Sequence, residues 1–170
     1  MAMLNCTYLL IVFFILMNFN PLIAQTSDQD GHHHEHADYE LGLSLGMTRL
    51  VEEAENALSS HLHFSRKLGG TELLERFSLG LGFEYIFTKH PHYSVVGTIS
   101  INPIWALIVD ISPGVLITEH DGSKEKLFVT HLELTYEFDY QGFGIGPVVG
   151  AGFSEEDNHL MIGLHIGKGF

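Results

Sequence analysis

Histidine is the residue type in this chain best suited to chemistry, and one short tract holds four of the 12 histidines. The tract consists of His32, His33, His34, Glu35 and His36. Clustered imidazoles beside a carboxylate are typical ligands of Zn²⁺, Cu²⁺ or Ni²⁺. The surrounding segment, residues 25–37, is polar and without hydrophobic periodicity, so we expect loose, buffer-like metal binding there. The alternative interpretation is a solvated spacer.

A second group of histidines and carboxylates shares one face of the strands predicted below. These residues are His61, His63, Glu84, Asp110, His131, Glu133, Glu137 and His165. His61 and His63 are two positions apart, so both project from the same face of a strand. Within this group, His61, His63, His131 and Glu133 are the candidate metal ligands. The alternative is a paired network that only fills the interior, since buried charges must be paired.

One short pattern raises an enzymatic alternative. His63, Phe64 and Ser65 match the His-x-Ser spacing of outer-membrane lipid A deacylases, and Glu84 would orient the histidine. A three-residue pattern is common by chance, and His63 and Ser65 share the face predicted to point inward, away from lipid. The glycines follow strand alternation and form no phosphate-binding loop. We therefore expect no catalytic residues, no bound cofactor other than a metal ion, and no enzymatic activity.

Composition limits the classes of protein to consider. The chain has 170 residues, 45% of them hydrophobic, and a net charge of −13. This length fits one domain, and the apolar content excludes a disordered chain. Only 8 Lys and Arg face 21 Asp and Glu, so we expect no nucleic-acid partner. The single Cys excludes a disulfide scaffold and a zinc site of the cysteine type.

The N-terminal segment has the pattern of an export signal. Residues 9–17 form an apolar run (LLIVFFILM) that is shorter than the about 20 residues needed to span a bilayer. The small residue Ala24 precedes a polar stretch, so we predict a signal peptide over residues 1–24, cleaved before Gln25. No Lys or Arg precedes the apolar run, a departure from the pattern. An uncleaved membrane anchor is the alternative.

From Asp38 to the end, apolar residues alternate with small or polar ones, which predicts β-strands. We expect strands at 38–48, 57–67, 74–88, 93–101, 106–119, 126–139, 142–153 and 159–170. Weak helical spacing over residues 50–58 suggests a short helical turn in a loop. Pro113 and Pro147 lie within strands and predict bulges or kinks, because proline cannot donate to a ladder.

Two features favour a membrane barrel over a soluble secreted sandwich, which stays the alternative. The polar face is mostly Gly, Ser and Thr, which suits the narrow lumen of a small barrel. Aromatic residues gather at strand ends, as in the girdles at bilayer interfaces; they are Tyr39, Phe77, Phe87, Tyr93, Tyr136, Tyr140, Phe143 and Phe153. We predict an all-β fold, an eight-stranded antiparallel up-and-down transmembrane β-barrel over residues 38–170.

The last strand supplies a resemblance. Phe170 is preceded at alternate positions by Ile166, Leu164 and Ile162, although Lys168 interrupts the series. This resembles the C-terminal signature by which bacterial outer-membrane proteins reach the barrel-assembly machinery. The chain resembles small eight-stranded outer-membrane barrels, similar in architecture to the membrane domain of outer membrane protein A. Its phrases HLHF, SPG and GLHIG are similar to those of uncharacterised His-rich barrels of Bacteroidota.

The resemblance implies a bacterial outer-membrane location, with outer-membrane lipid and the barrel-assembly machinery as partners. An even strand count places both ends of the barrel domain in the periplasm, which makes residues 49–56, 89–92, 120–125 and 154–158 extracellular. We expect a non-enzymatic integral barrel linked to transition-metal binding or handling, without a wide pore. The alternatives are a surface recognition or adhesion barrel that acts through short loops, and the lipid A deacylase.

Overall fold

The computed structural model describes residues 37–88, 92–104, 106–120, 123–155 and 158–170. The chain divides into two compact units, Met1–Glu35 and His36–Phe170. The predicted signal peptide and the histidine tract lie outside the described residues, and both stay predictions. In the described residues, no helix is long and apolar enough to cross a membrane.

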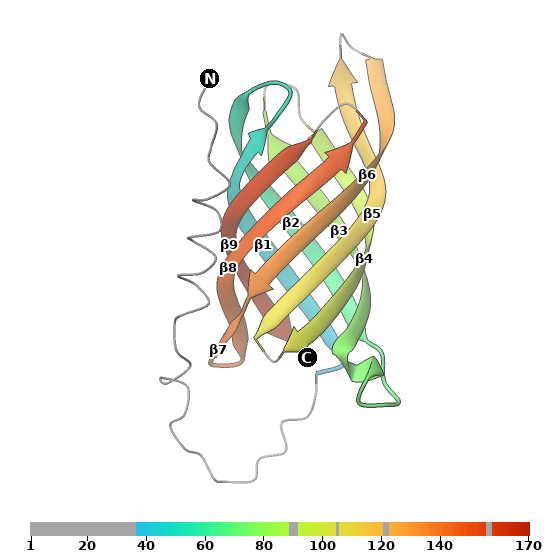
Figure 1. Cartoon of the computed structure of the whole chain (residues 1–170), viewed down its shortest axis with the longest axis vertical. Coiled ribbons are helices and arrows are strands. Elements are labelled where there is room, and N and C mark those ends of the chain that lie inside the picture. Colours follow the sequence, from blue (N-terminus) through green and yellow to red (C-terminus); the bar gives the residue numbers. More distant parts are fainter. Residues whose placement is uncertain (1–36, 89–91, 105, 121–122, 156–157) are drawn as a thin grey trace. The chain divides into compact units, whose positions relative to one another are not determined.

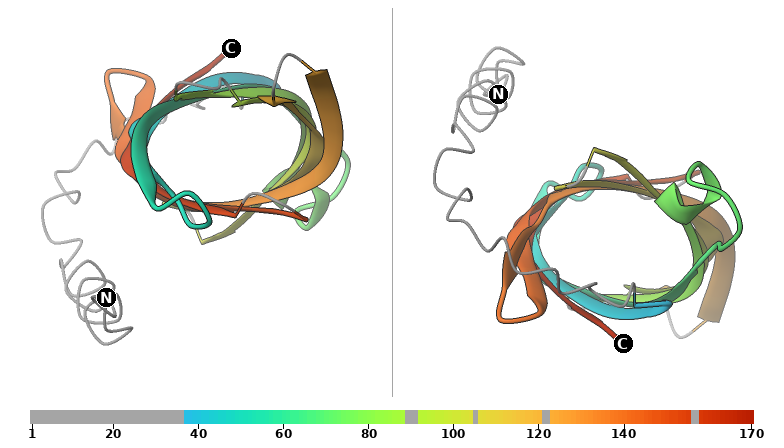
Figure 2. Two further views of the ribbon diagram at one scale, coloured as in Figure 1. Left: turned by 90° about the horizontal axis from the view of Figure 1, so that it is seen from above. Right: turned by 90° about the horizontal axis from the view of Figure 1, so that it is seen from below.

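The second unit is a closed antiparallel β-barrel (Figures 1 and 2), which confirms the predicted fold class. Its strands are β1 (Tyr39–Leu50), β2 (Glu55–Lys67), β3 (Phe77–Phe87), β4 (His92–Ile104), β5 (Leu107–His120), β6 (Ser123–Tyr136), β7 (Phe138–Tyr140), β8 (Phe143–Ser154) and β9 (His159–Gly169). Neighbours in sequence pair with each other from β1 to β6. Pairing of β1 with β9 then closes the ring.

The short β7 continues β6, since both pair with β8, so the barrel wall consists of eight strands. β6 pairs with β8 as far as Thr135 and Val148, and β7 resumes at Phe138 and Ile145 without a change of register. The interruption lies opposite Pro147, which has no N–H to donate. The ladder is interrupted at Pro147, but the register is the same on both sides of Pro147 and of Pro113, so neither proline produces a bulge in these pairings.

Most strand boundaries differ from the sequence prediction by one to three residues, and β4 extends to Ile104 instead of residue 101. The helical turn expected over residues 50–58 is wrong, because β1 runs to Leu50 and a turn over residues 51–54 leads directly into β2. The third strand begins at Phe77, since residues 74–76 form a short 3-10 helix, η2 (Leu74–Arg76). β6 begins at Ser123, three residues earlier than predicted, which makes the hairpin between β5 and β6 tight.

The barrel is apolar outside and polar inside. Leu81 and Leu164 are 70% and 60% exposed, and Leu134 is half-buried on the same outer surface, whereas the inward His61 is only 1% exposed. Tyr39, Phe87, Tyr140, Phe143 and Phe153 are exposed near strand ends. A soluble sandwich would bury its apolar faces and expose polar ones. The observed distribution is that of a barrel whose outer face contacts lipid.

The two ends of the barrel chain meet where the ring closes. The Tyr39 amide donates to the Phe170 carbonyl at 3.1 Å, and the Phe170 amide donates to the Tyr39 carbonyl at 3.0 Å. The rings of these residues stack at 6.2 Å, and the Phe64 ring lies 5.7 Å from Tyr39. These contacts define the terminal end of the barrel. The opposite end, which carries the turn over residues 51–54, is called the loop end.

Connections at the loop end are short. They comprise residues 51–54, 88–91, 121–122 and 155–158. The terminal end carries residues 68–76, 105–106 and 141–142, so the longest connection lies on the side for which the sequence predicted short turns.

Candidate metal centre

The loop-end half of the lumen contains two clusters of apolar side chains among buried polar ones such as His92, Ser94 and Thr118. One cluster joins the ends of β1, β2 and β3, and the other lies in the loop-end halves of β4, β5 and β6. Their members are Leu50, Ala57 and Ile86, and Val96, Leu116 and Val129. All six side chains are buried. Polar side chains line the lumen along its whole length, and the buried His159 lies directly across the ladder from Leu50.

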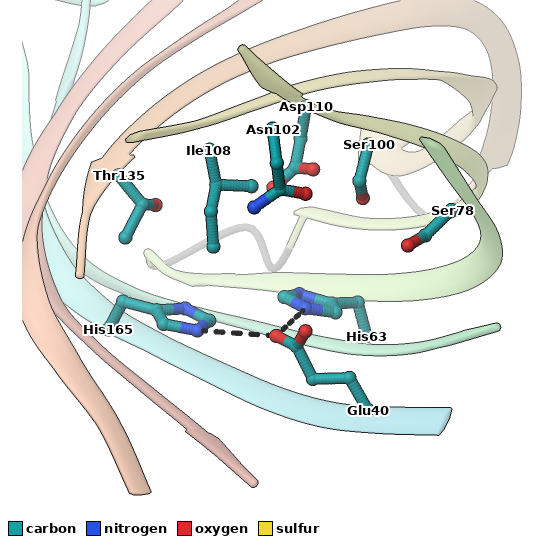
Figure 3. A pocket seen from close by; sticks show the side chains of 9 residues that line it. All are labelled: Glu40, His63, Ser78, Ser100, Asn102, Ile108, Asp110, Thr135 and His165. Atoms are coloured by element: carbon teal, nitrogen blue, oxygen red, sulfur yellow. Dashed lines mark ion pairs between the residues drawn. The ribbon is translucent and has the colours of Figure 1, made fainter. Parts of the chain in front are cut away.

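Nearest the terminal end, a carboxylate and two imidazoles meet from three adjacent strands. This terminal-end cluster consists of Glu40 on β1, His63 on β2 and His165 on β9 (Figure 3). Glu40 Oε1 lies 3.6 Å from His63 Nε2 and 3.9 Å from His165 Nε2. One potential ligand atom from each residue lies within 4.8 Å of the other two. Glu137 Oε2 is 3.7 Å from His165 Nε2 at the rim of this group.

The terminal-end cluster borders a small cavity. The other side chains of its lining come from β3, β4, β5 and β6; they are Ser78, Ser100, Asn102, Ile108, Asp110 and Thr135. About 10 Å³ is open to the centre of a water-sized molecule. That is room for about one water or one ion, and it excludes an organic ligand.

A second set of the same composition lies deeper in the lumen. This inner cluster consists of Glu84 on β3, His131 on β6 and His159 on β9, all buried. Glu84 Oε2 is 3.3 Å from His131 Nδ1, and Glu84 Oε1 is 3.4 Å from His159 Nε2. The Ser94 hydroxyl lies 3.5 Å from Glu84 Oε2 and 3.4 Å from His131 Nε2.

His61 and Glu133 stand between the two clusters. His61 Nδ1 pairs with Glu133 Oε1 across the lumen. The Ser44 hydroxyl lies 3.4 Å from Glu133 Oε2 and 3.0 Å from His165 Nδ1, so it links this pair to the terminal-end cluster. The two clusters are thus parts of one continuous polar network.

Five imidazole rings form a column that runs through this network. Ring centroids are 5.4 Å apart for His165 and His63, 5.8 Å for His63 and His61, 6.3 Å for His61 and His131, and 5.3 Å for His131 and His159. Successive rings are therefore neighbours along the lumen.

Glycines on neighbouring strands make room for these rings. A Cβ at Gly42 would lie 2.7 Å from His165 Cε1, and one at Gly82 would lie 2.6 Å from His61 Nε2. Gly42 and Gly82 both stand directly across from His63 in the two ladders of β2. At these inward glycines, the histidine rings occupy the space that a side chain would otherwise fill.

All the lumenal residues predicted from alternation lie on the inner face or at its rim, but they do not form one site. His63 belongs to the terminal-end cluster, His131 belongs to the inner cluster, and His61 with Glu133 lies between them. Sequence reasoning missed Glu40 and His159 as site residues. Their strand parity points inward, and that signal was available at both positions.

The residues of the deacylase alternative do not assemble. Glu84 pairs with His131 and His159, whereas His63 pairs with Glu40. Ser65 is buried on the lumenal face, away from the outer surface.

Comparison with known proteins supports the fold. No family model matches the chain, and no curated protein sequence matches it. Neisserial surface protein A superposes with a TM-score of 0.59 at 5% identity, over 79% of this chain and 98% of that one. The attachment invasion locus protein of Yersinia pestis superposes with a TM-score of 0.52 at 11% identity, over 78% and 99%. Both are small eight-stranded outer-membrane barrels.

Proposed function

We propose that this protein is a non-enzymatic integral outer-membrane barrel whose lumen binds divalent transition-metal ions. One observation carries the metal part of the proposal. The lumen contains two sets of one carboxylate and two imidazoles, each with potential ligand atoms within 4.8 Å of one another. This combination of ligands suits Zn²⁺, Cu²⁺ or Ni²⁺.

The distances within the clusters support metal coordination. Two ligand atoms in a tetrahedral zinc site, each about 2.0–2.1 Å from the metal, lie roughly 3.3 Å apart. The nitrogen–oxygen distances are 3.3 and 3.4 Å in the inner cluster and 3.6 Å for His63 and Glu40. These values exceed the 2.7–3.2 Å range of ordinary N–H···O hydrogen bonds. The distance between His165 and Glu40 is longer, at 3.9 Å.

The outer-membrane location draws on the apolar outer face, on the fold and on the predicted signal peptide. An exposed belt of leucine, isoleucine and phenylalanine covers the strands and requires lipid around it. The histidine tract, residues 32–36, immediately precedes β1 in the sequence. We propose that it adds loose metal binding on the periplasmic side.

Surface recognition is the less supported alternative. It rests on the fold shared with the attachment invasion locus protein, and a fold at 11% identity carries no ligand with it. The loop-end connections contain at most four residues each, which offers little surface for a partner.

Zinc stoichiometry tests the proposed function. We would fold the chain from Gln25 onward in detergent and titrate it with Zn²⁺ by calorimetry, beside a variant with His32, His33, His34 and His36 changed to Ala. The tract variant should retain two lumenal ions per barrel. Replacing His131 and His159 by Gln in that background should leave one ion. Ser112→Ala, also buried in the lumen but outside both clusters, is the control.

Two results would count against the proposal. If the folded variant without the tract histidines bound no zinc, the proposal of lumenal metal sites would be rejected. Equal zinc binding with and without the His131 and His159 substitutions would show that the inner cluster holds no metal.

A further inference from the structure

We propose that the lumen is a chamber with one entrance, through which metal ions pass from the terminal-end cluster along the imidazole column to the inner cluster. This inference rests on the proposed metal binding and adds its direction and order. The terminal-end cluster is the entrance site, and the inner cluster is the final site.

In the part of the chain that the structure describes, buried side chains close the loop end. Leu50 and Ile86, at the loop ends of β1 and β3, are 0% and 1% exposed, and Leu116 on β5 is 1% exposed. The turn that follows β1 is tied to the residue that precedes β9, since the Asn158 amide donates to Glu52 Oε2 at 2.8 Å and its side chain donates to Glu52 Oε1 at 2.6 Å. The two apolar clusters offer a hydrated ion no ligand, and the histidines next to them in the ladders, His92 beside Ile86 and His159 beside Leu50, are buried.

The terminal end is open. The Glu40 and Glu137 side chains are 29% and 26% exposed, whereas His63 and His165 directly behind them are 5% and 3% exposed. The cavity lined by Glu40, His63 and His165 lies at this end, and Figure 3 shows both imidazoles directed at the Glu40 carboxylate. Two carboxylates at the rim attract a cation, and two imidazoles behind them accept it.

The column offers unoccupied nitrogen ligands beyond the entrance. His63 Nδ1 and His61 Nε2 are buried and have no hydrogen-bond partner in the described part of the chain. The other nitrogen of each ring faces a carboxylate, Glu40 for His63 and Glu133 for His61. Such a contact fixes an imidazole and increases its basicity as a metal ligand. Successive rings lie 5.3–6.3 Å apart, so an ion can bind the next ligand before it leaves the last.

The size of the cavity defines which ions can enter. With room for about one water beside the entrance, an ion must exchange most of its water for imidazole and carboxylate. Mg²⁺ loses its water reluctantly, and Ca²⁺ takes six to eight oxygen ligands. Borderline transition metals exchange water for imidazole readily. The chamber therefore takes Zn²⁺-like ions and excludes hard cations.

Blocking each end in turn tests the direction. The chain from Gln25 onward contains no cysteine, so one cysteine can be introduced and labelled with a bulky maleimide after folding. Asn102→Cys places the label in the lining of the entrance cavity, and Glu53→Cys places it in the exposed loop-end turn. Both changes are made in the variant that lacks the tract histidines. Co²⁺ uptake is followed by its visible absorption after rapid mixing.

The label at position 102 should remove the fast phase of Co²⁺ uptake, whereas the label at position 53 should leave it unchanged. Changing both His63 and His165 to Gln should slow filling of the inner cluster by roughly an order of magnitude and still leave one ion bound. Thr118→Val, an isosteric change in the loop-end half, is the control for lumenal substitution.

The possible failures are distinguishable. Slow uptake with the label at position 53 and fast uptake with the label at position 102 would show that ions enter at the loop end. Fast uptake with both labels would contradict the proposal of a single entrance, although the metal sites themselves would not be affected. Absence of a Co²⁺ spectrum in the unlabelled protein would overturn the proposed function itself.

Discussion

His61 and Glu133 pair across the lumen although their strands, β2 and β6, are not neighbours in the barrel wall. Both side chains are buried, and 72 positions separate them in the sequence. The pair therefore connects opposite sides of the ring through its interior, independently of the ladders that connect strands along the wall.

Removing one member of this pair should be costly. Glu133→Leu leaves His61 without its carboxylate, and the expected loss is about 3–5 kcal/mol of unfolding free energy. The double variant, with Leu at positions 61 and 133, should recover most of that loss because no buried charge remains. Urea unfolding in lipid vesicles measures both. Additive effects of the single changes would show that the contact contributes no coupling.

The glycine beside His61 gives a second prediction. Gly82→Ala places a Cβ 2.6 Å from His61 Nε2 and 2.9 Å from Val96 Cγ2, so we expect a loss of roughly 1–3 kcal/mol. Gly97→Ala is the control, because a Cβ at Gly97 meets nothing within 4 Å. It should change stability by no more than about 0.5 kcal/mol. Equal losses at both positions would mean that backbone freedom, and not ring packing, requires glycine.

The lipid-facing surface predicts a dependence on depth. Leu81 lies in the middle of β3 on the outer face, and Arg in its place should cost about 2–4 kcal/mol. Leu160 is the second residue of β9, near the loop end, where Arg should cost only about 0–1 kcal/mol. The heat-modifiable shift on gels and urea unfolding in vesicles report the outcome. Similar costs at both positions would place the membrane elsewhere on the barrel.

The histidine tract predicts metal binding that depends on pH. Neutral imidazole binds metal and imidazolium does not, so zinc affinity should be full above about pH 6.5, the ordinary pKa of histidine, and lost below it. The contribution of the tract is the difference in calorimetry between the intact chain and the variant with Ala at 32, 33, 34 and 36. A difference that stays constant from pH 7.5 to 5.5 would contradict binding by neutral imidazole.

The C-terminal phenylalanine predicts an assembly defect. Phe170→Ala removes the ring that stacks on Tyr39 and approaches Phe64 at 6.3 Å, while the backbone hydrogen bonds to Tyr39 can still form. We expect slower insertion into the outer membrane with a normal final barrel. Pulse-labelled cells assayed by the gel shift measure the rate. An unchanged rate would remove the terminal residue from the assembly signal.

Alternation was sufficient to predict the strands and their inner face, because the side-chain period of a strand is two. The small residues of the polar face and the aromatic strand ends were needed to favour a barrel over a sandwich. His61, His131 and Glu133 all lie inside as expected. Turns were harder to predict. The spacing from Leu50 to Leu58 suggested a helix, yet hydrogen bonding between β1 and β2 extends to Leu50 and Glu55 and leaves only a tight turn.

The grouping of the ligands could not be predicted from alternation. Parity gives the face of a residue but not its height, which depends on strand tilt and on the stagger around the ring. Glu40 and His165 meet because β1 and β9 close the barrel, a pairing between the first and last strands that local patterns do not reveal.

The bond pair between Tyr39 and Phe170 also fixes the order in which this molecule can assemble. Every other pair of neighbouring strands in the wall is consecutive in the sequence, so it pairs through a short connection. β1 can close the ring only after β9 has been made. Pairings between distant segments are slow to form. Until that last docking, β1 and β9 present open edges whose N–H and C=O groups pair with foreign strands and are costly to place in lipid. A chain that ends within β9 would therefore form an open sheet with two unpaired edge strands. We expect such a chain to aggregate before it enters a bilayer.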